Sequence, residues 1–315
     1  MKAIQITAFG GPEVMQYTDL PDPVAGDSEI VLDVTAVGIN YADTHQTENS
    51  YLSPQTLPMV PGIEVTGTHA GKRYLASVSS GGYAQKAIAH EAALIPIPDA
   101  VTDQQALCML VQGSTAWHLL KTMGSVKAGQ TVVIHAAAGG VGTIAIQLAK
   151  MWGAKVIAVT SSQEKVDLAK SLGADEVVDA RDSDLGKSLR AANGGRGVDL
   201  VLEMVGGTTF DQSLVALGNF GKLITFGMAS RTAPTPIHPG SLMHGSKTVA
   251  GFWLANCFGK KELMNDVIAE LFALVASGKL RPVIGSTYPL SKAADAHRAM
   301  LARETTGKVA LDPAL

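Results

Sequence analysis

The clearest candidate for chemistry in this sequence is a glycine-rich turn that joins a short apolar run to a helical pattern. Residues 131–134 are apolar or β-branched, residues 136–142 read AAAGGVG, and apolar residues then recur at helical spacing up to residue 152. Strand, glycine turn and helix form the first unit of a dinucleotide-binding fold. We expect Gly139 to let the backbone approach a pyrophosphate and Gly142 to let the helix pack closely on the strand. N–H groups at the start of the helix would then face the phosphate charge.

The turn departs from the usual G-x-G-x-x-G pattern, because Ala137 replaces its first glycine. Taken alone, A-x-G-x-x-G also suits a glycine turn in any strand–helix–strand unit. The surrounding elements have to distinguish the two interpretations.

The end of the next predicted strand bears on the choice of dinucleotide. An NAD-binding chain usually places Asp or Glu there, about 20 residues beyond the glycine turn, to bind the ribose 2′-hydroxyl. This sequence has Thr160, Ser161 and Ser162 instead, followed by Lys165. Hydroxyl donors beside a cation suit a 2′-phosphate, which favours NADP(H). Alternatively, Ser161 or Ser162 only caps the helix that begins at Gln163.

The elements that must position these residues alternate strictly between strand and helix, which is typical of a doubly wound parallel sheet. Strands are predicted at residues 131–135, 155–160, 176–179, 198–204, 222–226 and 248–252. Helices are predicted at residues 142–152, 163–172, 183–191 and 209–216.

The two ends of the chain have a different sequence pattern from this alternating central region. Residues 1–110 hold short β-rich segments separated by Gly and Pro, which predicts a compact antiparallel barrel with loops. A helix is predicted from Ser114 to Met123, and a long amphipathic helix at residues 260–277 precedes a strand–helix–strand tail. We expect this tail to return to the first domain. The predicted domains are therefore residues 1–112 with 255–315, and an inserted dinucleotide-binding domain of residues 113–254.

Composition narrows the class of protein. The 315 residues are 46% hydrophobic with a net charge of −3, which predicts two globular domains and no partner among nucleic acids or anionic membranes. No apolar run is long enough to span a membrane, and the start of the chain has no apolar leader segment, so we expect a cytoplasmic protein. Cys108 and Cys257 lie in apolar surroundings and are expected to be buried thiols.

Several stretches, taken together with the glycine turn, resemble one family. They are GINYAD (38–43), LPMVPGIE (57–64), GGYA (81–84), QGSTA (112–116), LGAD (172–175) and TTGK (305–308). The sequence resembles the medium-chain dehydrogenase/reductase superfamily, and within it the zinc-free quinone oxidoreductase branch, which includes ζ-crystallin-like proteins. The resemblance implies a doubly wound parallel Rossmann sheet inserted in a GroES-like β-barrel catalytic domain, with NADPH as the cofactor.

The resemblance also bears on metal. Zinc alcohol dehydrogenases of this superfamily carry Cys at the position of Asn40 and His at the position of Ile63, and neither Asn40 nor Ile63 can supply those ligands. We therefore expect no metal ion. The histidines with no ligand spacing are expected to be surface or packing residues; they include His45, His69, His90 and His118.

The resemblance further implies which residues meet the cofactor. Asn40 and Thr115 are expected near the nicotinamide or its ribose. Arg303 resembles a C-terminal arginine that reaches the 2′-phosphate in some relatives; alternatively, it is an exposed cation at a helix end. The remaining expected contacts are Ala137, Gly139, Gly140 and Val141 for the pyrophosphate, Thr160, Ser161 and Lys165 for the 2′-phosphate, and Val205, Phe226, Gly227, Met228, Phe252, Trp253 and Leu254 for the nicotinamide half.

Without a metal, hydride acceptors that need little polarisation are favoured, namely a quinone or the β-carbon of an α,β-unsaturated carbonyl. Tyr51 resembles the tyrosine acid of related enoyl-thioester reductases and is, with Asn40, the candidate catalytic residue. Alternatively, Tyr51 only packs in a loop and water supplies the proton. Tyr41 and Trp253 are further expected walls of a substrate pocket. Many relatives have Tyr where this chain has Ala180, so one phosphate contact is missing.

Two other functions stay open at this point. The chain could be an enoyl-thioester reductase, although no basic cluster suggests a site for the phosphates of coenzyme A. It could also be a non-enzymatic, NADPH-binding protein of the crystallin kind. The resemblance implies a homodimer, formed through the predicted edge strand at residues 248–252.

Overall fold

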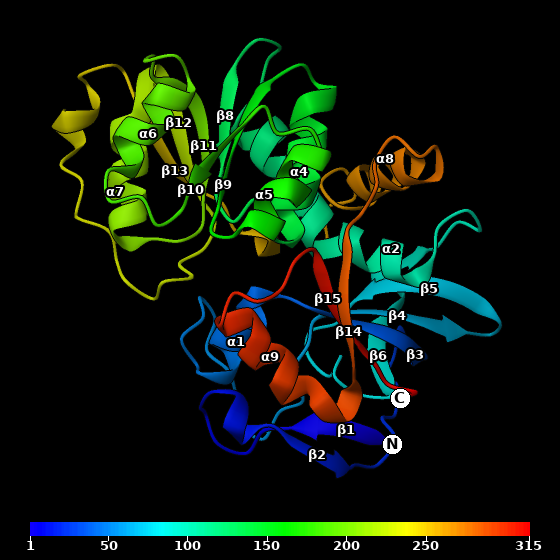
Figure 1. Cartoon of the computed structure of the whole chain (residues 1–315). Helices are drawn as coiled ribbons and strands as arrows, with labels where there is room; N and C mark the ends of the chain where they lie inside the picture. The colour runs from blue at the N-terminus through cyan, green and yellow to red at the C-terminus, as the bar shows by residue number, and fades with distance from the viewer. The chain divides into compact units, whose positions relative to one another are not determined.

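The computed structural model describes residues 1–315, and the chain divides into two compact units. The first unit comprises Met1–Gln112 and Phe258–Leu315, and the second comprises Gly113–Cys257. Both ends of the chain therefore contribute to the same unit (Figure 1).

The second unit is built on a parallel sheet of six strands in the order β10-β9-β8-β11-β12-β13. The strands are β8 (Thr131–Ile134), β9 (Lys155–Thr160), β10 (Glu176–Asp179), β11 (Val198–Glu203), β12 (Leu217–Thr225) and β13 (Thr248–Gly251). The order reverses between β8 and β11, and such a switch point is where open α/β sheets bind their ligands.

Helices cover both faces of this sheet, as the alternation in the sequence predicted. The helices are α3 (Ser114–His118), α4 (Gly140–Met151), α5 (Gln163–Ser171), α6 (Leu185–Ala192) and α7 (Gly207–Ala216). α4 and α5 pack on one face, while α6 and α7 lie side by side on the other (Figure 1). The helix predicted from Ser114 to Met123 is interrupted, because its second half adopts wider π-helical turns at Leu119–Met123.

The first unit holds a seven-stranded sheet in the order β14-β15-β3-β4-β5-β7, with β6 also paired to β3, and a separate hairpin of β1 and β2. The strands are β1 (Lys2–Gln5), β2 (Gln16–Asp19), β3 (Glu29–Ile39), β4 (Glu64–His69), β5 (Lys72–Ser77), β6 (Lys86–His90), β7 (Leu94–Pro96), β14 (Ile284–Pro289) and β15 (Lys308–Asp312). Pairing among β3 to β7 is antiparallel, as predicted. The tail makes the sheet mixed, because β14 runs parallel to β15.

Four α-helices accompany this sheet: α1 (Tyr41–Thr47), α2 (Asp103–Cys108), α8 (Asn265–Ala276) and α9 (Ala293–Leu301). Helix α1 was not predicted, because most of its buried side chains are polar and give no apolar periodicity. The helix predicted at residues 260–277 begins only at Asn265, after a turn. No helix in the chain has the length and apolar character needed to cross a membrane.

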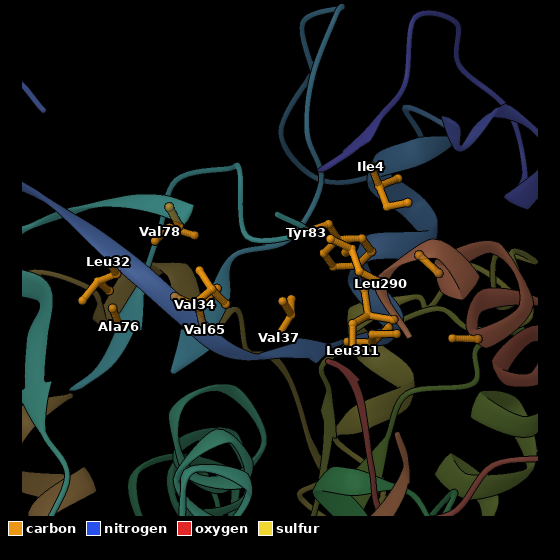
Figure 2. Close-up of a cluster of buried hydrophobic side chains, with 14 of the residues drawn as sticks. Ile4, Leu32, Val34, Val37, Val65, Ala76, Val78, Tyr83, Leu290 and Leu311 are labelled. Carbon is orange, nitrogen blue, oxygen red and sulfur yellow. The ribbon is translucent and has the colours of Figure 1, made fainter. Parts of the chain in front are cut away.

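The core of the first unit lies where β3, β4 and the tail meet (Figure 2). Leu32, Val34 and Val37 of β3 are buried together with Tyr83 and with Leu290 from the tail. Alternation along β3 sends Leu32 and Val34 to the same side of the strand, which explains why this segment has a period of two. The buried strand ends at Ile39, so its next residue, Asn40, is delivered to the start of α1.

Candidate functional site

The glycine turn lies at the carboxyl end of β8, beside the switch point of the parallel sheet. A Cβ atom at Gly142 would lie 2.6 Å from Ala137 Cα and 2.5 Å from Ala136 O, so only glycine fits there. Gly142 therefore allows the start of helix α4 to pack closely against the turn that follows β8. A Cβ atom at Gly139 would meet only Ala136 O, at 3.2 Å. Packing within the chain therefore does not require a glycine at position 139, and its bare backbone leaves room for a ligand.

The first turn of α4 presents unsatisfied backbone donors. Gly139 is the N-cap of the helix, no side chain caps it, and the first turn carries no acidic residue. The first N–H groups of a helix have no partner inside it and attract anions. Gly139, Gly140 and Val141 are half-buried, whereas Gly142 and the seven residues after it are buried. The Gly139 N–H donates to Ala136 O at 2.8 Å, so the donors that the turn offers to a ligand are those of Gly140 and Val141.

The carboxyl end of β9 carries the hydroxyl groups expected to meet a 2′-phosphate. Ser162 is the N-cap residue of α5, as the alternative interpretation expected, but its side chain makes no capping hydrogen bond. The Thr160 hydroxyl oxygen is buried and has no hydrogen-bond partner within the chain. A cavity of about 380 Å³ opens beside this strand end, and its lining includes Thr160, Ser161, Ser162 and Arg181.

The Thr160 hydroxyl has no partner within the chain, and no packing contact explains the glycine at position 139. Both observations are expected where a ligand binds. No carboxylate lies at residues 160–162, where an NAD-binding chain would hold the ribose. Ala180, which follows β10, donates its N–H to Thr160 O at 2.7 Å and is exposed. Arg181 lies beside it, paired with Asp179 at 2.8 Å. The residues present fit NADPH at this end of the site.

The loops after β11 and β12 are held in place by a buried carboxylate. Glu203 Oε1 accepts the N–H groups of Val205 at 2.7 Å and Gly206 at 2.9 Å. Burial raises the pKa of Glu203, and the two N–H donors oppose that shift. The backbone N–H of Phe226 donates to Glu203 O at 2.9 Å, which ties the end of β12 to the end of β11. Val205, Phe226, Gly227 and Met228 therefore lie at the same sheet edge as the glycine turn.

The segment after β13 continues the same edge. Phe252 donates its N–H to Thr225 O at 2.9 Å, and its ring packs on His118 with 5.7 Å between ring centroids. Thr115, three residues before His118, is buried in α3. Phe252, Trp253 and Leu254 thus follow the last strand into a short 3-10 turn at Leu254–Cys257.

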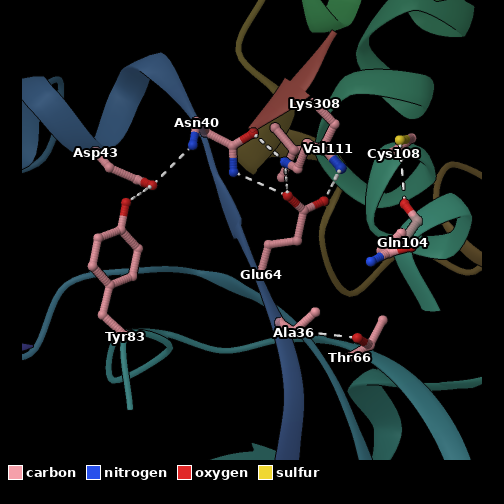
Figure 3. Close-up of polar contacts among 10 residues, drawn as sticks. All are labelled: Ala36, Asn40, Asp43, Glu64, Thr66, Tyr83, Gln104, Cys108, Val111 and Lys308. Atoms are coloured by element: carbon pink, nitrogen blue, oxygen red, sulfur yellow. Dashed lines mark hydrogen bonds and ion pairs between the residues drawn. The ribbon is translucent and has the colours of Figure 1, made fainter. Parts of the chain in front are cut away.

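Within the first unit, the side chain of Asn40 is held by a buried ion pair (Figure 3). Asn40 Nδ2 donates to Glu64 Oε2 at 3.1 Å, and Asn40 Oδ1 accepts from Lys308 Nζ at 3.0 Å. Lys308 also contacts Glu64 directly, and Glu64 Oε1 accepts the N–H of Val111 at 2.8 Å. Glu64 is fully buried, Lys308 is 2% exposed and Asn40 is 4% exposed.

A second buried network starts at Asp43, in the first turn of α1 (Figure 3). Asp43 Oδ2 accepts the N–H of Asn40 at 2.9 Å and the hydroxyl of Tyr83 at 2.8 Å. Burial raises the pKa of Asp43 to about 6, and the pKa of Tyr83 is raised by burial and then by the Asp43 charge. His297 of α9 lies 2.9 Å from the Tyr83 hydroxyl, and burial lowers its pKa to about 4.

The tyrosines predicted to line a pocket form an aromatic row next to Asn40. Tyr41 and His45 lie on α1 with ring centroids 5.8 Å apart, and Tyr51 follows at 6.5 Å from His45. Tyr51 is half-buried in an irregular segment. His45 is buried and contacts Ser50 Oγ at 3.0 Å, in keeping with a packing role.

The structure places the predicted residues in two sets. Asn40, Tyr41, Tyr51 and Arg303 belong to the first unit, and the other predicted contacts belong to the second. Arg303 is exposed just beyond α9 and has a left-handed backbone with φ of 60°. No three His, Cys, Asp or Glu side chains are grouped so that they could hold a metal ion.

Sequence reasoning missed the partners that fix Asn40. Glu64 and Lys308 belong to the quoted motifs LPMVPGIE and TTGK, but no role was predicted for either. A buried Lys beside β-branched and apolar residues gives no local sign of its partner 244 positions away. The sequence did contain one signal. Glu64 and Lys308 each stand directly before an apolar residue at the start of a strand, and an ionisable side chain is rarely buried in such a place unless another charge pairs with it.

A parallel sheet with a glycine turn at its switch point, inserted in a unit built from both chain ends, defines the class of the medium-chain dehydrogenases and reductases. Residues 140–273 match the zinc-binding dehydrogenase family. The chain is 32% identical to quinone oxidoreductase from Sus scrofa, over 99% of this chain and 97% of that protein.

Two solved structures extend this similarity. Quinone oxidoreductase from Thermus thermophilus, determined with and without NADPH, is 36% identical over 99% of this chain and 100% of its own, with a TM-score of 0.89. The Escherichia coli enzyme complexed with NADPH is 31% identical over the same shares, with a TM-score of 0.93. The chain belongs to the quinone oxidoreductase branch of the medium-chain dehydrogenase/reductase superfamily.

Proposed function

We propose that this protein is an NADPH-dependent, metal-free oxidoreductase that transfers hydride to a quinone or to an α,β-unsaturated carbonyl. The observation that carries the proposal is the end of β9, where Thr160, Ser161 and Ser162 offer hydroxyls and none of the three positions holds the carboxylate that binds the ribose 2′-hydroxyl in NAD-binding chains. NADPH in the solved Thermus and E. coli relatives supports the choice of cofactor.

The chain would bind the cofactor mainly through backbone donors and hydroxyls. The N–H groups of Gly140 and Val141 would hold the pyrophosphate, with the backbone of Ala137 and Gly139 close beside it. Thr160, Ser161 and Lys165 would bind the 2′-phosphate, and Arg303 would add charge there. The nicotinamide half would meet the backbone of the loops that Glu203 fixes, with Thr115 close to its ribose. These loop contacts comprise Val205, Phe226, Gly227, Met228, Phe252, Trp253 and Leu254.

NADPH, when bound, supplies the hydride, so the chain has to orient the acceptor and exclude water. Tyr41, Tyr51 and Trp253 would form the walls of the acceptor pocket. As hydride arrives, negative charge develops on the acceptor oxygen, and a donor placed there lowers the barrier. Asn40 and the Tyr51 hydroxyl are the donors proposed for this oxygen.

The decisive experiment is NADPH oxidation with three acceptor classes: quinones, small enones and enoyl-CoA thioesters. Turnover with quinones or enones is expected. Preference for the thioesters would instead identify an enoyl-thioester reductase, which the missing basic cluster makes the weaker candidate. Tight NADPH binding without turnover on any acceptor would contradict the enzymatic proposal and favour a binding protein of the crystallin kind.

The same proposal includes a homodimer formed through β13. This strand ends the six-stranded sheet, so one of its edges has no partner within the chain and can pair with a second copy. Light scattering is expected to give twice the mass of the 32.7 kDa chain. A monomer at micromolar concentration would contradict the dimer but not the activity.

A further inference from the structure

The Asn40 side chain has lost most of its freedom to the ion pair that surrounds it. An ammonium group can only donate hydrogen bonds and a carboxylate can only accept them. Lys308 therefore requires the Asn40 oxygen, and Glu64 requires the Asn40 nitrogen, at 3.0 and 3.1 Å. If the amide were flipped, its NH2 group would face the Lys308 ammonium, donor against donor, and its oxygen would face the Glu64 carboxylate, acceptor against acceptor.

We propose that Glu64 and Lys308 are positioning residues that lock the Asn40 carboxamide in one of its two orientations. The inference rests on the proposed function, in which Asn40 meets the cofactor or the acceptor. The second Nδ2–H remains for a ligand, and the lock decides where it points. Asn40 thus presents a donor with fixed direction to an acceptor oxygen.

The backbone around the pair is adapted to it. Gly38 of β3 lies beneath the two side chains, and a Cβ atom there would lie 2.7 Å from Lys308 Cε and 2.8 Å from Lys308 Nζ. Gly38 has no left-handed backbone conformation, so the reason for a glycine is space for the ion pair and not backbone freedom. The N–H of Val111 completes the hydrogen bonds of Glu64 from a different segment. Three separate segments therefore fix one amide.

This geometry provides two ways to release the lock. Gly38→Ala adds one methyl group and displaces the pair without changing any charge. Glu64→Gln/Lys308→Met removes both charges together, so that no buried charge is left alone. In the double variant the amide oxygen introduced at position 64 keeps the Val111 N–H, and the amide nitrogen faces Asn40. Asn40 is then expected to turn its oxygen toward this nitrogen, which inverts the amide.

The test compares NADPH oxidation by the wild type, Gly38→Ala, Asn40→Ala and the combination of the two. Gly38→Ala is expected to lower kcat/KM by about tenfold or more, because the donor is misplaced. In the Asn40→Ala background the same substitution should change the rate less than about twofold, since nothing is left to position. Glu64→Gln/Lys308→Met replaces Gly38→Ala if that variant fails to fold. Thr66→Val is the control. Thr66 is buried on β4, the strand of Glu64, but its hydroxyl bonds only to Thr35 and Ala36.

Full additivity of Gly38→Ala and Asn40→Ala, or wild-type activity in Gly38→Ala, would overturn the inference. A wild type with no turnover would instead contradict the proposed function. In that case NMR tests the lock without turnover. The resonances of the Asn40 side-chain N–H groups are assigned by their loss in Asn40→Ala. Slow hydrogen exchange in the wild type and fast exchange in Gly38→Ala support the lock, and fast exchange in both contradicts it.

Discussion

The hydroxyl of Tyr83 donates a hydrogen bond to Asp43 across 2.8 Å, in the fully buried interior of the first unit. Tyr83 has a single proton, so the contact at 2.9 Å with His297 Nε2 requires His297 to be the donor. His297 is then neutral with its proton on Nε2, in keeping with a pKa lowered to about 4 by burial.

Asp43 should make folding stability depend on pH in an unusual direction. Its pKa of about 6 in the folded chain exceeds the value of about 3.9 expected when unfolded. The folded chain therefore binds a proton more readily between pH 4 and 6, and its stability from this group falls as pH rises through that range. The two-unit difference corresponds to about 3 kcal/mol.

His297 acts in the opposite sense. Its folded pKa of about 4 lies below the unfolded value of about 6.5, so its contribution to stability is lost as pH falls between these values. Asp43→Asn removes the pH dependence that comes from Asp43 and leaves that of His297. When the pH is lowered from 7 to 4.5, the variant should therefore lose about 2 kcal/mol more free energy of unfolding than the wild type, as measured by urea unfolding at the two pH values. His297→Gln should lose less than the wild type, and parallel pH profiles for all three proteins would contradict the assignment.

Gly139 and Gly142 provide a matched pair that separates binding from folding. Gly142→Ala should lower stability by several kcal/mol, about 3 or more, because its Cβ would overlap backbone atoms that cannot move aside. Gly139→Ala should leave the melting temperature nearly unchanged but weaken NADPH binding by about tenfold or more, as its Cβ occupies space meant for the pyrophosphate. Thermal unfolding and fluorescence titration measure the two effects. Unchanged affinity in Gly139→Ala would place the pyrophosphate elsewhere.

Lys165 should decide the preference for NADPH over NADH. Lys165→Ala removes a charge expected at the 2′-phosphate, so the Kd for NADPH should rise by about tenfold while that for NADH stays within about twofold. Lys187→Ala is a suitable control, because it removes an exposed lysine of α6 that does not line the cavity beside the end of β9. Equal losses for both nucleotides would show that Lys165 acts on the fold and not on the phosphate.

Tyr51 should act as a hydrogen-bond donor if it has the catalytic role proposed. Tyr51→Phe keeps the ring beside His45, so a loss of activity reports the hydroxyl alone. The kcat for enones should fall by about tenfold or more, whereas quinones, which can take their proton from water, should be less affected. Unchanged rates with enones would leave Tyr51 a packing residue.

The sequence by itself was sufficient for the second unit. Strand–helix alternation and the glycine turn are local signals, because each βα unit buries its own apolar face and each glycine answers a local clash, as Gly142 does against Ala136 and Ala137. The absence of a carboxylate at residues 160–162 is read directly from the sequence, whereas the order of the six strands was given by the structure.

The first unit needed the tertiary structure. Helix α1 carries buried polar residues that no apolar periodicity predicts, and one of them, Asp43, finds its partner in Tyr83, 40 positions away. Asn40, Glu64 and Lys308 are separated by up to 268 positions, and only folding brings them within hydrogen-bond distance. The sequence determined which chemical groups are present, whereas the tertiary structure decided which charge faces which side of an amide. Ion pairs and hydrogen bonds between distant segments depend on the three-dimensional path of the chain, and residue types do not encode that path locally.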